Sequence, residues 1–310
     1  MLEQAQRDDS LVVITPAMPA GSCLRPMMKE FPERCIDVGI AEGHSLTYAA
    51  GIARGGNCHV IVAIYSTFFQ RAIDNLYHDI CIQGLPVVLA LDRGGIAGGD
   101  GITHNGIYDI GFLNEMPGMV IAQPRNGEIL KELFNTCFNW KCPAVIRYPN
   151  LSTDESQDLK LKDRPLGCAE ILTQGRDVCI VSLGHMADEA LKLRQLLIDN
   201  HTIEATVIDP IFVKPLDETL FFDVFSSHRI IITLEEHSVR GGLGSILNSF
   251  ATQHNMNHLQ IINFGVPDEF VHHGSHKDLL DQLGLSAPKV YQTLLEKEVL
   301  MPSSPIEVPS

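Results

Sequence analysis

Short, continuously apolar runs alternate with helix-length segments along most of this chain. The segments between the first runs, at 43–54, 67–83 and 126–140, have the length and composition of helices. Runs that are apolar at every position are typical of strands buried on both faces. The pattern therefore predicts an α/β fold built on a mainly parallel sheet covered by helices. The apolar runs of this first part are 11–15, 59–65, 86–91, 119–122 and 144–147.

A second block of the same kind follows a polar break at 151–166. Its predicted strands and helices alternate as before, at 178–182, 186–200, 205–208, 216–226, 230–233, 243–254, 259–262 and 276–283. We therefore expect two domains of this fold class, at 1–150 and 167–298, joined by a linker at 151–166. Residues 299–310 are expected to form a flexible tail.

The net charge and the cysteine pattern limit the kinds of partner and the cellular compartment that we expect for this protein. The formal net charge of −15 argues against nucleic acid or an anionic membrane as a partner. The eight cysteines include no C-x-x-C pair and most lie in apolar surroundings, which favours reduced thiols in a cytoplasmic protein. The acidic N-terminus does not resemble a signal peptide, and no apolar run is long enough to cross a bilayer.

Glu42 lies where the apolar run 36–41 ends and a small-residue helix begins. A carboxylate at that point can simply favour the helix dipole. It is also withdrawn from water, and such a group readily shares a proton with a ring nitrogen. The position alone favours the first interpretation.

Two further segments are expected to bring charged, polar and aromatic side chains to the same sheet edge as Glu42 and His44. Each follows a predicted strand, at 65–75 and 92–106. Ligands of open α/β folds bind at the carboxyl edge of the sheet. This edge is expected to collect an acid, two histidines, aromatic rings and cations around a glycine-lined hollow. The side chains are Glu42, His44, Tyr65, Phe68, Arg71, Arg93, Asp100 and His104.

These segments resemble the 1-deoxy-D-xylulose-5-phosphate synthase family of transketolase-like thiamine diphosphate enzymes. The matching runs extend over about residues 10–297. They are 37–42, 65–72, 92–94, 100–106, 147–149, 182–184, 234–237, 265–268 and 273–275. The resemblance implies the pyrimidine-binding domain and the C-terminal domain of that family. The family's diphosphate-binding domain, with its Mg²⁺ ligands, has no counterpart in the matched runs.

The resemblance also implies a reaction. Pyruvate and glyceraldehyde 3-phosphate are condensed to 1-deoxy-D-xylulose 5-phosphate and CO2, a precursor of isoprenoids, thiamine and pyridoxal. Glu42 is then expected to hydrogen-bond the cofactor's pyrimidine nitrogen, with Phe68 stacked on that ring and Ile40 beside it. The acceptor side is expected to be formed by Tyr65, Arg71, Arg93, Asp100 and His104, with Asp100 and His104 assisting proton transfer. The resemblance further implies a homodimer, and we expect it to lie in the cytoplasm. We also expect this chain to be inactive without the diphosphate-binding domain.

Two positions depart from the family pattern. The family usually has arginine after Tyr148-Pro149, as part of a phosphate clamp, where this chain has Asn150. It usually has glutamine after the catalytic acid, where this chain has Gly43.

Three other patterns are interpreted as structural. Gly99-Asp100-Gly101 with Asn126 has the spacing of a diphosphate and metal motif, but it does not open a helix directly after a strand. The run 241–244 is interpreted as close packing of a helix on a sheet. His272, His273 and His276 lie in one short loop with no acid or cysteine to complete a metal set, so no metal ligands are expected.

Alternative functions remain open. A separately encoded transketolase half, or the beta subunit of a 2-oxo-acid dehydrogenase, has the same two-domain plan. A truncated module that binds a partner without catalysis is the non-enzyme alternative. The runs 65–71 and 100–104 favour the synthase.

Overall fold

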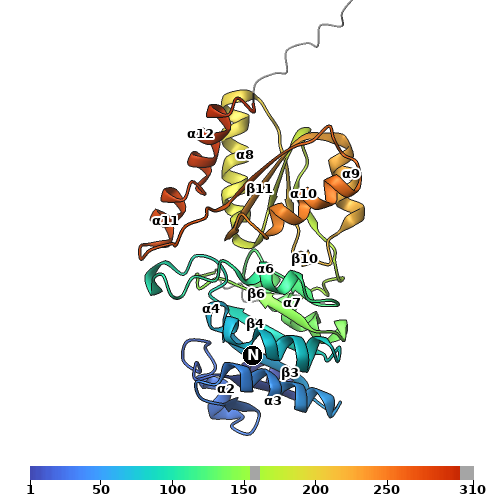
Figure 1. Cartoon of the computed structure of the whole chain (residues 1–310), viewed down its shortest axis with the longest axis vertical. Helices are drawn as coiled ribbons and strands as arrows, with labels where there is room; N and C mark the ends of the chain where they lie inside the picture. The colour runs from blue at the N-terminus through green and yellow to red at the C-terminus, as the bar shows by residue number, and fades with distance from the viewer. Residues whose placement is uncertain (154–160, 301–310) are drawn as a thin grey trace, which may run out of the picture.

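The computed structural model describes residues 1–153 and 161–300, which form two α/β units stacked one above the other (Figure 1). The rest of the predicted linker and of the predicted tail, 154–160 and 301–310, lies outside the described residues. Both units consist of mostly parallel sheets flanked by helices, as the alternating pattern predicted.

The first sheet has the strand order β10-β5-β6-β4-β3-β1-β2. Neighbouring strands pair in parallel except β10, which is antiparallel to β5. The central strands β3 and β4 are buried at almost every position, which explains their unbroken apolar sequences. The strands are β1 (Leu11–Thr15), β2 (Cys35–Asp37), β3 (His59–Tyr65), β4 (Val87–Asp92), β5 (Val120–Ala122), β6 (Ala144–Arg147) and β10 (Phe212–Lys214).

Helices cover both faces of this sheet. One face carries α3 and the run from α4 to η2, which bury Leu46, Phe69 and Ile80 against the strands. The other face carries α2 and α7, which bury Met27 and Leu133. The helical segments are α1 (Leu2–Ala5), α2 (Arg25–Glu30), α3 (Glu42–Arg54), α4 (Ser66–Phe69), η1 (Gln70–Ala72), α5 (Ile73–Asn75), η2 (Leu76–Cys81), η3 (Gly98–Asp100), α6 (Asp109–Asn114), α7 (Gly127–Thr136) and η4 (Cys137–Trp140).

The second sheet has the order β12-β11-β8-β9-β7, with β7 antiparallel to β9. Helices α8 and α12 lie on one side of it and α9 and α10 on the other (Figure 1). The strands are β7 (Glu170–Thr173), β8 (Asp177–Ser182), β9 (Thr206–Asp209), β11 (His228–Ser238) and β12 (Gln260–Val266). The helical segments are η5 (Gly184–Met186), α8 (Ala187–His201), α9 (Glu218–Ser227), α10 (Leu243–Gln253), α11 (His276–Gln282) and α12 (Ala287–Glu296).

Every predicted strand is present within a few residues, but short elements were missed. Strand β10 belongs to the second block of sequence yet extends the first sheet, where Phe212 is buried near the edge of Trp140 with ring centroids 5.6 Å apart. Three residues carry too little pattern to reveal a strand, and periodicity does not tell which sheet a strand joins.

Arg147, at the end of β6, is fully buried where the two units meet. Its Nε donates to Asp109 Oδ2 at 2.8 Å, and its Nη2 donates to the backbone oxygens of Gly106 at 2.6 Å and Glu236 at 2.9 Å. Its Nη1 donates to Gln123. One guanidinium thus joins β6, α6 and β11, and a Cβ at Gly94 would lie only 2.4 Å from its Cγ.

Among the described residues, no helix combines the length and the apolar character that crossing a membrane requires. All eight cysteines are free thiols.

Candidate active site

Glu42 is the first residue of α3, and its side chain is only 8% exposed. Arg71 Nη1, from η1, donates to Glu42 Oε1 at 2.8 Å. The Arg71 side chain is 63% exposed, so much of its guanidinium still faces solvent. Of the described residues, Arg71 alone hydrogen-bonds this carboxylate, and it uses one oxygen. Oε2 therefore remains able to accept a hydrogen bond from a bound group.

An aromatic group lies next to this pair. The rings of Tyr65, at the end of β3, and Phe68, in α4, stack with centroids 5.4 Å apart and planes 10° apart. The His104 ring meets Phe68 edge-on at 5.3 Å. The Arg71 guanidinium carbon lies 5.7 Å from the Phe68 centroid, so Phe68 connects the Glu42 pair to the other rings. Tyr65 is buried, whereas Phe68 and His104 are half-buried, so part of the Phe68 ring remains open to stacking by a planar ligand.

Arg93 closes the other side of the aromatic group. Its guanidinium carbon lies 3.9 Å from the Tyr65 ring centroid, a cation–π contact. Its Nη1 donates to Asp92 Oδ2 at 2.6 Å and its Nε donates to Asp100 Oδ2 at 3.2 Å. Burial raises the pKa of Asp92 despite the neighbouring guanidinium, and burial likewise raises the pKa of the Tyr65 hydroxyl. The arginine is held by acids yet faces the same edge as Glu42.

The structure brings most of the predicted site residues to one sheet edge. Tyr65, Phe68, Arg71, Arg93, Asp100, His104 and Glu42 are linked by the contacts above. Ile40 is 82% exposed just before Glu42, at the rim of the site. His44 instead points along α3 and stacks on Tyr48 at 5.8 Å. The roles predicted for these residues stay predictions.

The two departures from the family pattern have different settings. At Gly43 a Cβ would lie 2.6 Å from Asn75 Oδ1, so the side chain of Asn75 takes the space beside Glu42. Asn150 is exposed two residues after Tyr148, whose backbone oxygen accepts from Gly94 N at 2.9 Å. Asn150 therefore follows a segment bonded to the Arg93 loop.

Two of the three patterns interpreted as structural have local partners. Asp100 pairs with Arg93, while Asn126 Oδ1 accepts from Ile129 N at 3.0 Å and caps α7. Gly242 allows α10 to approach the buried Glu235, which accepts from Leu243 N and Gly244 N, each at 2.8 Å, and Gly244 allows the helix to approach Asn263. Burial raises the pKa of Glu235 to about 7. The 241–244 run thus serves helix–sheet packing, as predicted.

The described residues fit one half of thiamine diphosphate. A buried carboxylate with an available oxygen, a stacked aromatic pair and the exposed Ile40 match an aminopyrimidine ring. For the diphosphate and its Mg²⁺, the described residues at this edge offer Arg93, Arg71 and Asp100, but Asp100 is already paired with a cation. The set therefore suits the pyrimidine end of the cofactor.

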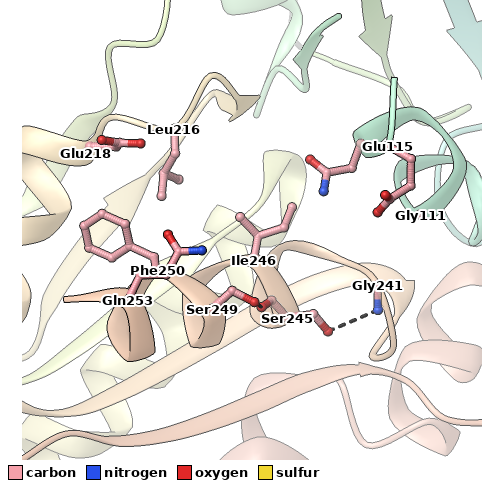
Figure 2. Close-up of a pocket in the computed structure, with 11 residues that line it drawn as sticks. Gly111, Glu115, Leu216, Glu218, Gly241, Ser245, Ile246, Ser249, Phe250 and Gln253 are labelled. Atoms are coloured by element: carbon pink, nitrogen blue, oxygen red, sulfur yellow. Dashed lines mark hydrogen bonds between the residues drawn. The ribbon is translucent and has the colours of Figure 1, made fainter. Parts of the chain in front are cut away.

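A cavity of about 330 Å³ lies elsewhere, between α6, α10 and the start of α9. Figure 2 shows Glu115 and Glu218 on opposite sides of it. None of its eleven lining residues is a lysine, arginine or histidine, and none is a predicted site residue. An acidic cavity without cations does not suit a phosphorylated substrate, so the sheet edge remains the better candidate.

Sequence reasoning missed three features of this region. It did not predict that Arg71, expected on the substrate side, also donates to Glu42. It assigned no role to Arg147, and it did not connect Glu236, on β11, with the loop that carries Asp100 and His104. That connection is a hydrogen bond of 2.8 Å from Ile96 N to Glu236 Oε2. The acidic pair at 235–236 inside an apolar strand was the signal available in the sequence.

Comparison with known proteins identifies both units. The family model described as the transketolase pyrimidine binding domain matches residues 1–154, and that of the transketolase C-terminal domain matches residues 167–290. The 1-deoxy-D-xylulose-5-phosphate synthase of Chlamydia trachomatis serovar L2 is 47% identical over 300 residues, which is 96% of this chain and 46% of the relative. The same enzyme of Chlamydia muridarum is 46% identical, over 95% of this chain and 46% of the relative. The chain spans about half the length of these relatives.

Solved structures agree on the fold. A protein described as a split gene transketolase, inactive beta4 tetramer, superposes with a TM-score of 0.83 and 26% identity, over 97% of this chain and 96% of that one. A transketolase from Campylobacter jejuni superposes with a TM-score of 0.75 and 17% identity, over 94% of this chain and 44% of that one. The second likeness supports the fold alone.

Proposed function

This chain belongs to the transketolase family, and we propose that it is the pyrimidine-binding and substrate-binding portion of a 1-deoxy-D-xylulose-5-phosphate synthase. The supporting observation is the single sheet edge that joins the buried carboxylate of Glu42 to the Tyr65, Phe68 and His104 rings and to Arg93. The reaction joins pyruvate to glyceraldehyde 3-phosphate and releases CO2. Cytoplasmic location and a homodimer are part of the proposal.

The chain's residues divide the work between cofactor and acceptor. Thiamine diphosphate, when bound, supplies the stabilisation of the carbanion that decarboxylation of pyruvate leaves. Glu42 holds a proton at the pyrimidine nitrogen, and Phe68 fixes the ring plane by stacking. The largely exposed guanidinium of Arg71 attracts the acceptor phosphate, to which a guanidinium can donate two parallel hydrogen bonds. Arg93 adds positive charge and its Nη2, since its Nε and Nη1 already donate to Asp100 and Asp92.

Proton control on the acceptor side falls to Asp100 and His104. The Asp100 side chain is 38% exposed while bonded to Arg93, so it can still accept from a substrate hydroxyl. The His104 Nδ1 is hydrogen-bonded to Thr103 Oγ1 at 2.9 Å, which holds the ring edge-on to Phe68. Nε2 is the nitrogen then available to an incoming aldehyde oxygen.

We expect the 310-residue chain alone to be inactive and to bind thiamine diphosphate weakly, because its residues fit only the pyrimidine end. Turnover should appear when the chain is mixed with a separately produced diphosphate-binding domain of a Chlamydia relative. The assay measures CO2 release from pyruvate that depends on glyceraldehyde 3-phosphate. Robust turnover by the chain alone would overturn the expected inactivity.

The same assay separates the alternatives. A transketolase half would instead transfer a two-carbon unit from a ketose phosphate without CO2 release. A 2-oxo-acid dehydrogenase subunit would release CO2 without an aldehyde acceptor, by acylating a lipoyl group. A non-catalytic module would bind the added domain and turn over none of these substrates.

Replacing Asn150 by arginine tests the phosphate clamp in the reconstituted enzyme. A further charged hydrogen bond is expected to lower the KM for glyceraldehyde 3-phosphate by roughly 10-fold. Unphosphorylated glyceraldehyde is the matched control substrate, and its KM should stay unchanged. An equal fall for both substrates would mean that the new arginine does not act on the phosphate.

A further inference from the structure

Three potential metal ligands from distant parts of the chain converge beside the loop 92–106, which carries Arg93, Asp100 and His104. Glu236 lies on β11, His276 begins α11, and His185 lies in η5. The Nε2 atoms of His276 and His185 lie 2.6 Å and 2.8 Å from Glu236 Oε1. The loop histidines His272 and His273 are exposed and do not belong to this group. The carboxylate that the 272–276 loop lacks is thus supplied by Glu236 of strand β11.

The burial of this group requires a positive partner for the acid. The Glu236 side chain is fully buried, and no lysine or arginine side chain among the described residues pairs with it. The two imidazoles are the only side-chain partners of this carboxylate in the described residues.

His185 is poorly served by hydrogen bonds. Both of its ring nitrogens are buried, and neither makes a hydrogen bond of acceptable geometry within the described residues, although Nε2 lies 2.8 Å from Glu236 Oε1. A buried imidazole without hydrogen bonds is unfavourable. A bound cation would use the nitrogen lone pair that the protein leaves unused.

We propose that His185, Glu236 and His276 bind a divalent transition metal ion of the zinc class. Two imidazoles and one carboxylate are a donor set that zinc and its neighbours accept, with water in the remaining position. The three donor atoms lie within 4.8 Å of one another. Donors around one tetrahedral ion at roughly 2.1 Å are about 3.4 Å apart, so on binding the two Nε2–Oε1 distances would lengthen by less than about 1 Å and any pair of donors near the 4.8 Å limit would close by about 1.4 Å. His276 is 23% exposed, which gives an ion access from solvent.

The carboxylate already has the outer support that metal ligands usually have. Glu236 Oε2 accepts from Ile96 N at 2.8 Å, which fixes the orientation of the carboxylate while Oε1 faces the histidines. A Cβ at Gly95 would lie 2.5 Å from the same Oε2, so only glycine permits this approach. An ion at this site would fasten the loop that carries Arg93, Asp100 and His104 to the second unit.

The test measures metal binding by the purified 310-residue chain, and it is independent of catalysis. After chelator treatment, the chain should take up one equivalent of Zn²⁺, and Co²⁺ should give the visible absorption of a nitrogen- and oxygen-ligated ion. Zinc should also raise the melting temperature, because it binds the folded state. His276→Gln and His185→Gln should each lower zinc affinity by roughly 100-fold or more, beyond the effect of losing an outer ligand partner.

His272→Gln is the matched control, since it removes an exposed histidine from the same loop and should leave zinc affinity unchanged. Circular dichroism of the metal-free variants checks that each one folds, and the two ligand variants check each other. No zinc uptake by the wild-type chain would overturn the proposal. So would zinc uptake that survives in both ligand variants. The zinc measurements involve no turnover assay. The metal proposal and the proposed function can therefore each fail independently of the other.

Discussion

Replacing Arg147 by methionine is expected to lower the free energy of unfolding by about 3–5 kcal/mol, the usual cost of breaking a buried ion pair. The arginine is fully buried, and its loss leaves the Asp109 carboxylate buried without its cation. It also removes the Arg147 donor from the backbone oxygens of Gly106 and Glu236, although that of Gly106 still accepts from Gly95 N. The corresponding fall in melting temperature is roughly 5–8 °C, because the entropy of unfolding grows with chain length. Chemical denaturation of the 310-residue chain measures the change.

Two further variants make the Arg147 result specific. Arg240→Met removes an arginine from an exposed pair, in which Arg240 and Asp268 are 76% and 75% exposed, and it should cost less than about 1 kcal/mol. Adding Asp109→Asn to Arg147→Met removes the uncompensated charge, and we expect recovery of about 0.5–3 kcal/mol. An Arg147 variant as stable as the Arg240 variant would contradict the assigned role at the junction.

Glu42→Gln in the reconstituted enzyme is expected to reduce turnover by at least about 100-fold, the usual range for losing an acid–base group. Glutamine keeps the shape and can still accept from Arg71, but it cannot exchange a proton with the pyrimidine nitrogen. The direct measurement is the exchange of the cofactor's thiazolium C2 proton with solvent, followed by NMR. That exchange should slow together with turnover.

The control for Glu42 is Glu33→Gln, which changes an exposed glutamate outside the site and should alter neither rate. The melting temperatures of both variants should remain close to that of the unmodified chain, because glutamine preserves side-chain volume. If C2 proton exchange proceeded unchanged in Glu42→Gln, Glu42 would not be the proton partner of the ring.

The position of Glu42 shows how much of the candidate site the local sequence pattern could predict. Its place at the start of a helix favoured a simple helix-dipole role, and it begins α3 as expected. The sheet order, with β3 between β1 and β4, brings the loops after β3 and β4 to the same edge as Glu42. That convergence follows from parallel pairing, so the sequence could predict it.

The pairing of individual side chains could not be predicted in the same way. Ile96 and Glu236 meet across 140 residues of sequence, and Arg147 meets Glu236 across 89. The apolar sequence around these two acids does not distinguish Glu236 from Glu235. In the structure Glu236 accepts from Ile96 N in the loop 92–106, whereas Glu235 caps α10. Similarly, the histidines at 272 and 273 could not be separated from His276 without knowing where β11 lies.

The sequence by itself therefore determined two mainly parallel sheets, the alternation of most strands and helices along the chain, and the sheet edge at which the candidate site residues lie. These follow from hydrophobic periodicity and from the rule that parallel strands present their carboxyl ends together. Only the tertiary structure decided that Arg71 holds Glu42, that Arg147 ties the two units together, and that Glu236 is joined by two histidines. The contacts of Arg147 and Glu236 depend on how the two units pack against each other, and the Arg71–Glu42 contact depends on how η1 meets α3 within the first unit. Neither kind of packing leaves a periodic trace in the sequence.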